Sequence, residues 1–371
     1  MRANEVLGII FSNVHDEMMA ELTEKRSIAS VPFGGRYRII DFSLSNLVNA
    51  GIRKVGIITK ANYHSLMDHL GAGRSWDLDR KKGGLFILPP YINGNGLYDG
   101  NINALIGVMT FLKHCTEKYV VLCDSDVVGN IDIEPIVDRH IKNDADVTVA
   151  YKYGIIPKNQ RDIMLFDFDG NEKVKDIVFA EQSDTPFNYS LDIMVLKLEK
   201  LIELVETAAG HNYTSFSINV LQRHLSSLTI YGYKVDNYTA VMDSIGSYYK
   251  ANMDLLDKSV REQLFDKSRP IYTKTRDDMP AKYGISSKAA NCIIGDGCKI
   301  EGTVENSVIF RGVKIGRDAV VKNCILMQDT VIEDGANLTY VTTDKNVVIT
   351  KGRCLTGSEN YPMVIRKNTI V

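Results

Sequence analysis

Histidine and cysteine are the residue types that most often carry chemistry in proteins, and here their spacing indicates neither a metal site nor a nucleophile. The six cysteines contain no Cys-x-x-Cys pair and do not combine with histidines into a zinc pattern. We expect the thiols to be reduced and mostly buried, and most of the seven histidines to have structural roles. The residues are Cys115, Cys123, Cys292, Cys298, Cys324 and Cys354, and His15, His64, His69, His114, His140, His211 and His224.

Length and composition indicate a folded protein with no overall attraction for polyanions. At roughly 150 residues per domain, the 371 residues predict two domains. The chain is 44% hydrophobic and 24% charged, and its 44 basic and 46 acidic residues leave a net charge of −2. This balance argues against nucleic acid or an anionic membrane as a partner. The longest early apolar run, Val6–Phe11, is too short for a membrane span or a secretion signal, so we expect a cytoplasmic protein.

The secondary structure that would position a site can be read from the first 250 residues, where short β-rich runs alternate with segments of helical periodicity. This alternation is typical of a doubly wound α/β domain. Predicted strands cover Val6–Phe11, Lys54–Thr59, Leu85–Leu88, Tyr119–Cys123 and Val147–Tyr151, with one helix ending at Ala50 and another over Ile133–Ile141. After Met164, further β-rich runs cover Phe166–Phe168, Lys173–Phe179, Leu191–Leu196, Leu228–Val235 and Tyr238–Met242, with helices near 198–207, 217–225 and 244–256.

The last part of the chain has a different pattern. The segment 259–290 is polar, contains two prolines and has no sustained periodicity, so we interpret it as a linker. Beyond Asn291, aliphatic residues recur at intervals of six in three runs, with glycines between them. The runs are Ile294 and Ile300, then Ile309, Ile315 and Val321, and, after a five-residue step, Leu326, Ile332 and Leu338. This repeat predicts a parallel β-helix, and a strand-rich sandwich is the alternative. Solenoid edges favour stacking, so we expect oligomerisation through this domain.

Several stretches, in order along nearly the whole chain, carry a specific resemblance. They are Val31–Phe42, Leu44–Asn46, Asn49–Ile52, Trp76–Arg80, Leu88–Pro90 and Tyr248–Leu255. Together they resemble the bacterial ADP-glucose pyrophosphorylases, or glucose-1-phosphate adenylyltransferases. The resemblance implies an α/β fold: a Rossmann-like, GT-A-like nucleotidyltransferase domain followed by a left-handed parallel β-helix. We place the first domain at residues 1–258, the linker at 259–290 and the β-helix at 291–371.

The segment after the first strand departs from the family's pattern. Active members have Gly-Gly-x-Gly-x-Arg-Leu there, because only glycine lets backbone N–H groups approach and cradle a triphosphate. Here Ser12 and Asn13 begin a segment without glycine or arginine, in which Asp16 and Glu17 add negative charge. A like-charge contact at 4 Å costs about 4 kcal/mol near a surface, so we expect the phosphate cradle to be lost.

Other substrate positions implied by the resemblance are altered as well. The lysine of Ala-Lys-Pro, expected to hold the nucleotide phosphates, is Ile28, and the sugar-phosphate lysine of Phe-x-Glu-Lys-Pro is Gln182. The glycine of Ser-Met-Gly-Ile-Tyr, which lines the sugar, is Asp192. Each missing charge-assisted hydrogen bond is worth roughly 1.5–3 kcal/mol, so these changes should slow nucleotide transfer by many decades.

Acidic residues of the family's catalytic site are retained. Asp126 matches the aspartate of Gly-Asp-His, Asp243 matches the aspartate of Asp-Val-Gly-Thr, and Glu181 keeps the glutamate of Phe-x-Glu. The resemblance implies that Asp126 and Asp243 bind Mg²⁺, which would bridge phosphates while a sugar phosphate attacks the α-phosphorus. Asp124-Ser125-Asp126 also resembles the D-x-D of sugar-nucleotide transferases. The alternative is that these aspartates only stabilise caps and turns, and a regulatory protein does not require the metal.

Basic residues near the first helices match a regulatory stretch. Thr23-Glu24-Lys25-Arg26 corresponds to the Thr-x-Lys-Arg that in some relatives contacts a sugar-phosphate effector, and Arg36 and Arg38 follow nearby. Our hypothesis is that Lys25, Arg26, Arg36 and Arg38 bind such an effector. The alternative is a solvated surface of weak salt bridges.

A well-kept scaffold with a degraded phosphate site predicts a non-catalytic or weakly active regulatory subunit of an ADP-glucose pyrophosphorylase in glycogen biosynthesis. Such a subunit would pair with a catalytic homologue, in a hetero-oligomer that we expect to be a tetramer. It can change the activity of its partner without chemistry of its own, because coupling requires only that it binds one conformation of the partner more tightly than another. Two alternatives stay open: an active transferase that makes ADP-glucose or another nucleotide sugar, and a stand-alone sensor of a sugar phosphate. A third, an acyltransferase, lacks a histidine inside the hexads.

Overall fold

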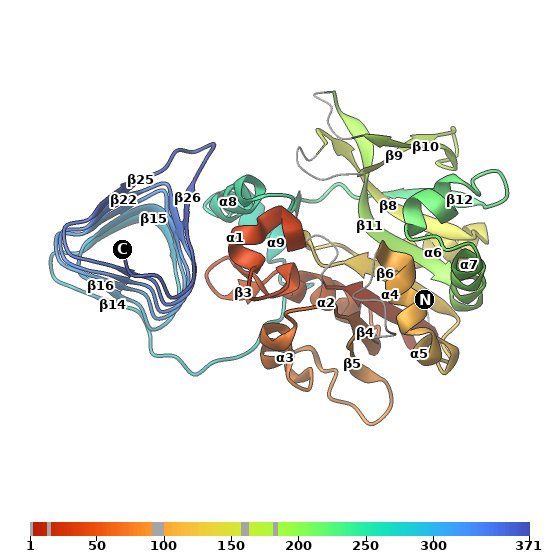
Figure 1. Cartoon of the computed structure of the whole chain (residues 1–371), viewed down its shortest axis with the longest axis horizontal. Helices are drawn as coiled ribbons and strands as arrows, with labels where there is room; N and C mark the ends of the chain where they lie inside the picture. The colour runs from red at the N-terminus through yellow and green to blue at the C-terminus, as the bar shows by residue number, and fades with distance from the viewer. Residues whose placement is uncertain (1–2, 13–15, 91–99, 157–162, 181–184) are drawn as a thin grey trace.

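Two bodies of secondary structure lie side by side in the computed structural model of the chain (Figure 1). The structure describes residues 3–12, 16–90, 100–156, 163–180 and 185–371. An α/β domain comes first, and a stack of triangular coils follows it after an extended connection. Across the described ranges, no helix is both long enough and apolar enough to cross a membrane.

A nine-stranded mixed sheet forms the centre of the first domain. Its main order is β10-β9-β11-β6-β1-β4-β5, and β8 pairs with β11 and β12. The strands are β1 (Val6–Phe11), β4 (Lys54–Ile58), β5 (Gly84–Leu88), β6 (Tyr119–Asp124), β8 (Val147–Gly154), β9 (Ile163–Phe168), β10 (Val174–Ala180), β11 (Phe187–Lys197) and β12 (Ile230–Lys234). β1 is parallel to β4 and β6, whereas β11 is antiparallel to β6 and β8. The predicted α/β class is confirmed, with an antiparallel strand inside the sheet that the sequence pattern did not predict.

The carboxyl end of β1 lies where the chain changes direction within the sheet. From β1 the chain passes through α2 (Ile40–Asn49) to β4 on one side, and it later returns through α4 (Gly100–Gly107) and α5 (Met109–Lys113) to β6 on the other. Phe11 at the end of β1 pairs with Asp124 at the end of β6. Ligands of open α/β sheets bind at such crossover points, so the ends of β1 and β6 are where a site is expected.

Helices cover the two faces of the sheet because its central strands are apolar on both sides. Alternate residues of β1 enter two separate cores, Val6 and Ile10 on one face and Leu7 and Ile9 on the other. The remaining α-helices are α1 (Ala20–Thr23), α3 (His64–Leu70), α6 (Glu134–Asn143), α7 (Leu198–Gly210), α8 (Ile245–Asp254) and α9 (Lys258–Leu264). Short 3₁₀ turns are η1 (Ala3–Glu5), η2 (Asp16–Met19), η3 (Ile28–Ser30) and η4 (Arg74–Trp76). η5 (Phe216–Gln222) is a π-helix, where the sequence predicted a helix near 217–225.

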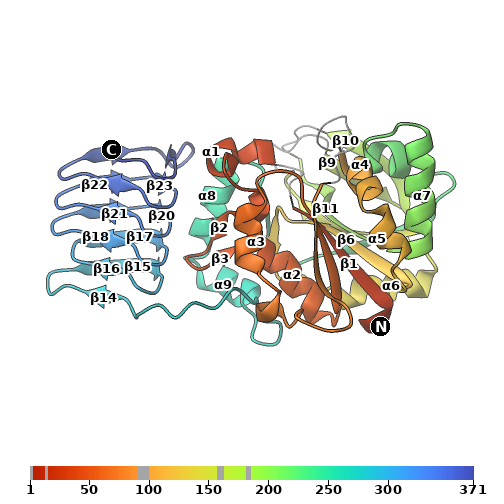
Figure 2. The same ribbon diagram turned by 60° about the horizontal axis from the view of Figure 1, so that its bottom comes forward.

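The second domain is a parallel β-helix, as the six-residue repeat predicts. Its strands form two sheets, in the orders β14-β16-β18-β21-β24 and β25-β22-β19-β17-β20-β23-β26, with β15 beside β17. Neighbouring strands within each sheet pair in parallel, which argues against the alternative of a strand-rich sandwich. Ile300, Ile315, Ile332 and Ile349 pair in register from coil to coil and are at most 2% exposed, so they line the interior. Figure 2 shows the stacked coils.

The strands of the β-helix are short. They are β14 (Lys282–Tyr283), β15 (Lys288–Ile294), β16 (Lys299–Ile300), β17 (Thr303–Ile309), β18 (Lys314–Ile315), β19 (Val320–Lys322), β20 (Ile325–Leu326), β21 (Val331–Ile332), β22 (Asn337–Thr339), β23 (Val341–Thr343), β24 (Val348–Ile349), β25 (Cys354–Thr356) and β26 (Met363–Ile365).

The extended connection is shorter than the predicted linker 259–290. Helix α9 occupies 258–264 at its start, and the first coil of the β-helix begins with β14 at Lys282, so only residues 265–281 lack helix and strand. The six-residue pattern does not reveal the first coil, because Ile285 and most residues of this coil are exposed and do not repeat as buried aliphatic positions. The connection is also attached to the first domain, because Tyr272 N–H donates a hydrogen bond of 2.9 Å to Ser45 Oγ on α2.

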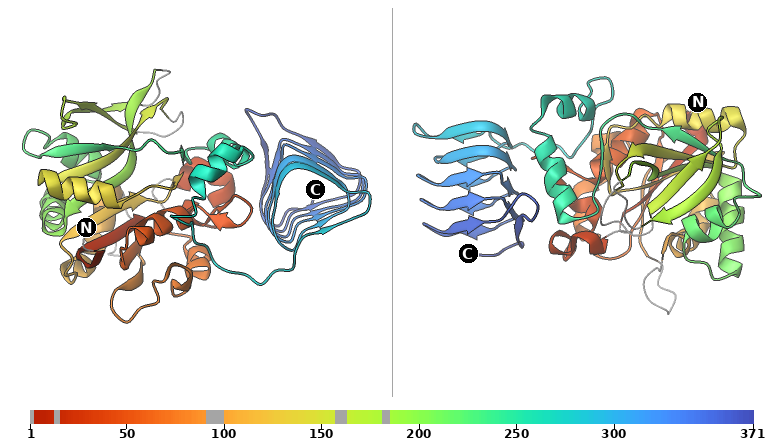
Figure 3. Two further views of the ribbon diagram at one scale, coloured as in Figure 1. Left: turned by 180° about the vertical axis from the view of Figure 1, so that it is seen from behind. Right: turned by 90° about the horizontal axis from the view of Figure 1, so that it is seen from above.

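The β-helix packs against the first domain beside α8 and the hairpin of β2 (Pro32–Phe33) and β3 (Tyr37–Arg38), as Figure 3 shows from two further directions. One apolar cluster contains side chains of both domains, including Phe33 and Tyr248 from the first and Phe310 from the second. Tyr249 Oη donates a hydrogen bond of 2.8 Å to the backbone carbonyl of Asn323. The stretch 31–42, which carries most of the sequence resemblance, therefore builds the junction between the domains.

Candidate functional site

The residue that follows β1 is held against the neighbouring strand. The backbone N–H of Ser12 donates a hydrogen bond of 3.1 Å to the carbonyl of Ile58, and its Oγ donates one of 2.9 Å to the same oxygen. Ser12 is 1% exposed, so its hydroxyl is directed into the sheet. Asn13, the next predicted substrate position, lies outside the described residues. The end of β1 is thus closed by a side chain where the active family needs bare backbone.

The carboxylate of Asp16, in the segment where the resemblance implies a phosphate cradle, is held by the chain. Asp16 Oδ1 accepts a hydrogen bond of 2.7 Å from the backbone N–H of Ile28, and Thr23 Oγ1 donates one of 2.6 Å to the carbonyl of Asp16. Ile28 itself is 1% exposed and belongs to the interdomain apolar cluster. The position of the expected lysine is therefore filled by a core side chain, and its backbone donor is taken by an anion of the chain.

The carboxylates of Asp126 and Asp192 lie close to Asp124, the last residue of β6. Burial raises the pKa of Asp124 well above its usual value, and the charges of Asp126 and Asp192 raise it further. Asp192 has a φ of +51° and lies where the register of β11 against β8 shifts. Its Oδ1 accepts a hydrogen bond of 3.1 Å from Ser190 Oγ. Aspartate is one of the few residues other than glycine that adopts this left-handed backbone, so the turn is retained while the surroundings become acidic.

The two predicted metal ligands are brought together by a short ribbon. β7 (Val127–Gly129) pairs antiparallel with β13 (Thr239–Val241), and the N–H of Met242 donates a hydrogen bond of 2.8 Å to the carbonyl of Asp126. Asp126 and Asp243 are 2% and 3% exposed. Asp243 Oδ1 accepts a hydrogen bond of 3.0 Å from Ser244 Oγ, which also caps α8. Residues that are far apart in the sequence are thus neighbours at the end of the sheet.

The donor chemistry of this aspartate pair suits Mg²⁺ only in part. Carboxylate oxygens are the right ligands, but within the described residues no group of three or more His, Cys, Asp or Glu side chains converges as a metal site. Mg²⁺ is usually held by one or two carboxylates together with phosphate oxygens and water. The fit of the site therefore depends on phosphates that the surrounding anions repel. Glu181 and Gln182 lie outside the described residues.

A groove of about 1050 Å³ opens between the two domains and reaches Asp243. Its walls come from η2 and α1, the start of α8 and the loop between β25 and β26, with Lys60 from the end of β4. The carboxylates of Asp16, Glu17 and Glu21 line it together with Asp243 and outnumber the one lysine. This surplus of negative charge repels a polyphosphate.

The four predicted effector residues fall into two groups. Lys25 and Arg36 are exposed, and the Arg36 guanidinium lies over the Tyr37 ring at 5.7 Å. Arg26 and Arg38 are 3% and 9% exposed at the domain junction. The four therefore do not form one surface cluster, and the solvated-surface alternative applies to the exposed pair only.

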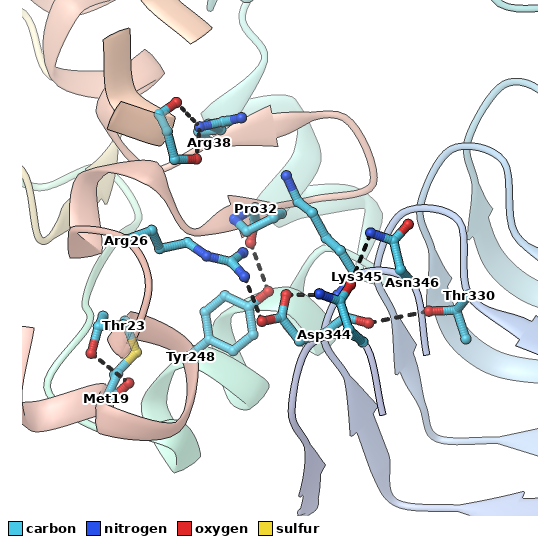
Figure 4. A network of polar contacts seen from close by, with 12 residues as sticks. Met19, Thr23, Arg26, Pro32, Arg38, Tyr248, Thr330, Asp344, Lys345 and Asn346 are labelled. Carbon is cyan, nitrogen blue, oxygen red and sulfur yellow. Dashed lines mark hydrogen bonds and ion pairs between the residues drawn. The ribbon is translucent and has the colours of Figure 1, made fainter. Parts of the chain in front are cut away.

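The buried pair is held in place by the chain (Figure 4). Arg26 Nη2 forms an ion pair with Asp344 of the β-helix, while its Nη1 has no hydrogen-bond partner within the described ranges. Arg38 Nη1 donates to the carbonyl of Ser65 at 2.6 Å and to its Oγ at 2.9 Å. Burial lowers the pKa of Arg38 to about 10.

Lys345 is a junction residue that sequence reasoning missed. It follows Asp344 and extends towards Arg38 in Figure 4. Burial, followed by the charges of Arg38 and Arg26, lowers its pKa to about 7. Nothing in the sequence signals this lysine, because it belongs to the β-helix and meets the arginines only in the folded chain. A pocket next to this junction is lined by Lys25, Arg26, Asp344, Glu21, Leu22, Glu24, Arg366 and Lys367.

The histidines and cysteines follow their predicted structural roles in part. His69 Nε2 lies 2.6 Å from Asp41 Oδ1, and His140 Nδ1 lies 3.0 Å from Thr148 Oγ1. All six cysteines are free; Cys123, Cys298 and Cys324 are buried, whereas Cys354 is exposed, so fewer thiols are buried than predicted.

The fold and the site define a nucleotidyltransferase-like domain joined to a hexapeptide β-helix. Residues 16–178 match the nucleotidyl transferase family, and residues 279–359 match the GlmU-like C-terminal hexapeptide family.

Relatives that align over nearly the whole chain show to which nucleotidyltransferase family it belongs. The glycogen biosynthesis protein GlgD of Bacillus subtilis (strain 168) is 35% identical over 99% of this chain and 97% of its own, and GlgD of Geobacillus stearothermophilus is 39% identical over the same shares. A glucose-1-phosphate adenylyltransferase of Clostridium perfringens (strain SM101 / Type A) is 30% identical over 100% of this chain and 96% of its own. The chain therefore belongs to the ADP-glucose pyrophosphorylase (glucose-1-phosphate adenylyltransferase) family, and GlgD proteins are among its relatives.

Proposed function

We propose that this chain is a regulatory subunit with little or no transferase activity of its own. It pairs with a catalytic homologue that converts ATP and glucose 1-phosphate into ADP-glucose and pyrophosphate for glycogen biosynthesis. The observation that carries the proposal is the hydrogen bond from Ile28 N–H to the Asp16 carboxylate, which puts a fixed anion where the nucleotide phosphates would lie. The relatives named for glycogen biosynthesis, which align over almost the whole chain, support the same pathway.

The substrate site as a whole supports weak or absent catalysis. Ser12 closes the end of β1, Ile28 is part of the core, and Asp124 and Asp192 add acid at the end of β6. The absence of each charge-assisted hydrogen bond to a phosphate weakens transition-state binding by roughly 1.5–3 kcal/mol. The surviving Asp126 and Asp243 are the residues that would hold Mg²⁺, which supplies charge stabilisation on phosphates when they are bound.

The first coil of the β-helix supports pairing with a second subunit. Ile285 is fully exposed, and Tyr283 and Met279 are 52% and 82% exposed beside it. β14 pairs only with β16 and β15 only with β17, so each leaves one edge unpaired among the described strands. An uncapped solenoid end with apolar side chains is a surface that another chain covers. A hetero-tetramer gives each subunit more than one such neighbour.

The junction of the two domains supports binding of a sugar-phosphate effector. Arg26, Arg38 and Lys345 bring three basic groups together, and Arg26 Nη1 is a buried donor with no hydrogen-bond partner in the described chain. A phosphate would accept hydrogen bonds from such groups and strengthen them as ion pairs. Because the site joins both domains, an effector that favours one arrangement of them would change how the partner is bound.

A reconstitution assay tests the proposal. The purified chain is incubated with ATP, glucose 1-phosphate and Mg²⁺, alone and with the catalytic homologue, and pyrophosphate release is measured. We expect the chain alone to turn over far more slowly than about 1 s⁻¹, to co-elute with the homologue and to change the rate of the mixture. Turnover of about 1 s⁻¹ or more by the chain alone would instead favour an active transferase. Effector binding without co-elution or a rate change would favour a stand-alone sensor.

A further inference from the structure

The groove between the two domains carries exposed glutamates on one wall and an exposed tyrosine on the other. Loss of phosphate binding alone does not account for this combination. Glu17 and Glu21 are exposed on successive turns of the η2–α1 segment, and neither forms an ion pair with a described residue. On the opposite wall, the loop between β25 and β26 presents Tyr361, which is 82% exposed, and β26 begins with Met363, which is 37% exposed. The groove thus combines two anions that lack an ion pair in the described chain with an open aromatic ring.

These features select a cationic occupant. A guanidinium or ammonium between the walls would pair with the two glutamates and lie against the ring of Tyr361, which attracts cations. A phosphate is repelled, and within the described residues no three acidic or histidine side chains converge to hold a metal ion. A volume of about 1050 Å³ exceeds what one side chain fills, so the groove fits a segment of polypeptide.

We infer that this groove, lined by Glu17, Glu21, Tyr361 and Met363, binds a lysine- or arginine-bearing segment of the catalytic partner subunit. The inference rests on the proposed function, because the partner is the homologue with which the chain pairs. One wall of the groove comes from residues 356–364. These residues belong to the last coils of the β-helix, at the opposite end of the stack from β14 (Figure 2), so the groove forms a second contact and not an extension of the first.

The location gives this contact a regulatory consequence. One wall belongs to the first domain and the other to the β-helix, and Arg26 and Asp344 join the same two domains nearby. A segment that contacts both walls is sensitive to their relative position. Effector binding at the junction would therefore change partner affinity without any chemistry in this subunit.

A charge-reversal experiment tests the inference. The dissociation constant for the purified catalytic homologue is measured for the full chain, for Glu17→Lys/Glu21→Lys and for the matched pair Glu199→Lys/Glu203→Lys on α7. We expect at least tenfold weaker binding for the groove variant and less than twofold change for the α7 variant, because close interfacial charge pairs contribute strongly. Glu17→Gln/Glu21→Gln should give an intermediate loss and a weaker salt dependence.

The outcomes separate the two hypotheses. If the unmodified chain does not bind the homologue, the proposed function fails and the inference with it. If it binds and the groove variant binds equally well, only the inference is wrong. As a second measurement, Tyr361→Cys labelled with a photo-crosslinker should capture a partner peptide that contains lysine or arginine. Capture of a peptide without either residue would overturn the inference even if the charge reversal had destabilised the fold.

Discussion

Arg26 and Asp344 form a buried ion pair that joins the first domain to the β-helix across 318 residues of sequence. Each side chain is 3% exposed, and Asp344 Oδ1 also accepts a hydrogen bond of 2.7 Å from the N–H of Lys345. The arginine that the resemblance assigns to an effector therefore already holds the two domains together. An anion that binds Arg26 Nη1 would therefore change the ion pair that connects the two domains.

Removing one partner of this pair should destabilise the chain strongly. Asp344→Ala leaves the Arg26 charge buried, which typically costs about 3–5 kcal/mol, whereas Arg26→Met/Asp344→Leu removes both charges and should recover most of the loss. Urea unfolding measures the difference. Lys200→Ala, which breaks the exposed pair with Glu203, is the control and should cost less than about 1 kcal/mol. A cost as small for Asp344→Ala would mean that the pair is solvated.

Lys345 should make stability depend on pH near neutrality. Its pKa falls from 10.5 in the unfolded chain to about 7 in the folded protein, mainly because it is buried. Between these values the unfolded chain binds more protons, so stability rises with pH over this range, and below pH 7 the full cost of the buried charge remains. Lys345→Met should remove this rise. The free energy of unfolding, measured from about pH 6 to pH 9 for both proteins, tests the prediction, and parallel curves would contradict it.

Restoring the two missing lysines should not restore catalysis. Ile28→Lys and Gln182→Lys return the expected phosphate ligands, but Ser12 stays bonded to Ile58 and the carboxylate of Asp16 stays in place. We expect pyrophosphate release to remain well below about 1 s⁻¹ until residues 12–18 are also replaced by the glycine-rich loop. Circular dichroism checks that the variants fold. Substantial activity from the two lysines alone would show that the segment after β1 is not the main obstacle.

A charge at the open end of the β-helix should prevent assembly without harming the fold. Ile285 is fully exposed, so Ile285→Asp should change the stability of the isolated chain by no more than about 0.5 kcal/mol. We expect the mass of the complex with the catalytic homologue, measured by light scattering, to fall. Ile155→Asp, at a residue that is 61% exposed on the first domain, is the matched control. Unchanged assembly for Ile285→Asp would place the pairing surface elsewhere.

The six-residue repeat predicts most of the β-helix but not the residue at which it begins. Aliphatic hexads predict the β-helix because its side-chain pattern is local and repeats along the chain, and Ile300, Ile315 and Ile332 are stacked as expected. The periodicity does not reveal the first coil, because Ile285 and its neighbours face solvent and interrupt the pattern. The antiparallel position of β11 was also invisible, since β-propensity does not record the direction of pairing.

For this protein, the sequence determined the fold class, the β-helix, the family and the absence of a glycine cradle, because each of these is written in residue types at short spacing. Only the tertiary structure decided that the Asp16 carboxylate lies on the N–H of Ile28, that Arg26 binds the β-helix instead of facing solvent, and that Lys345 loses much of its basicity. The physical reason is that charge pairing, burial and pKa depend on distances between segments that are far apart along the chain, and no local pattern encodes those distances.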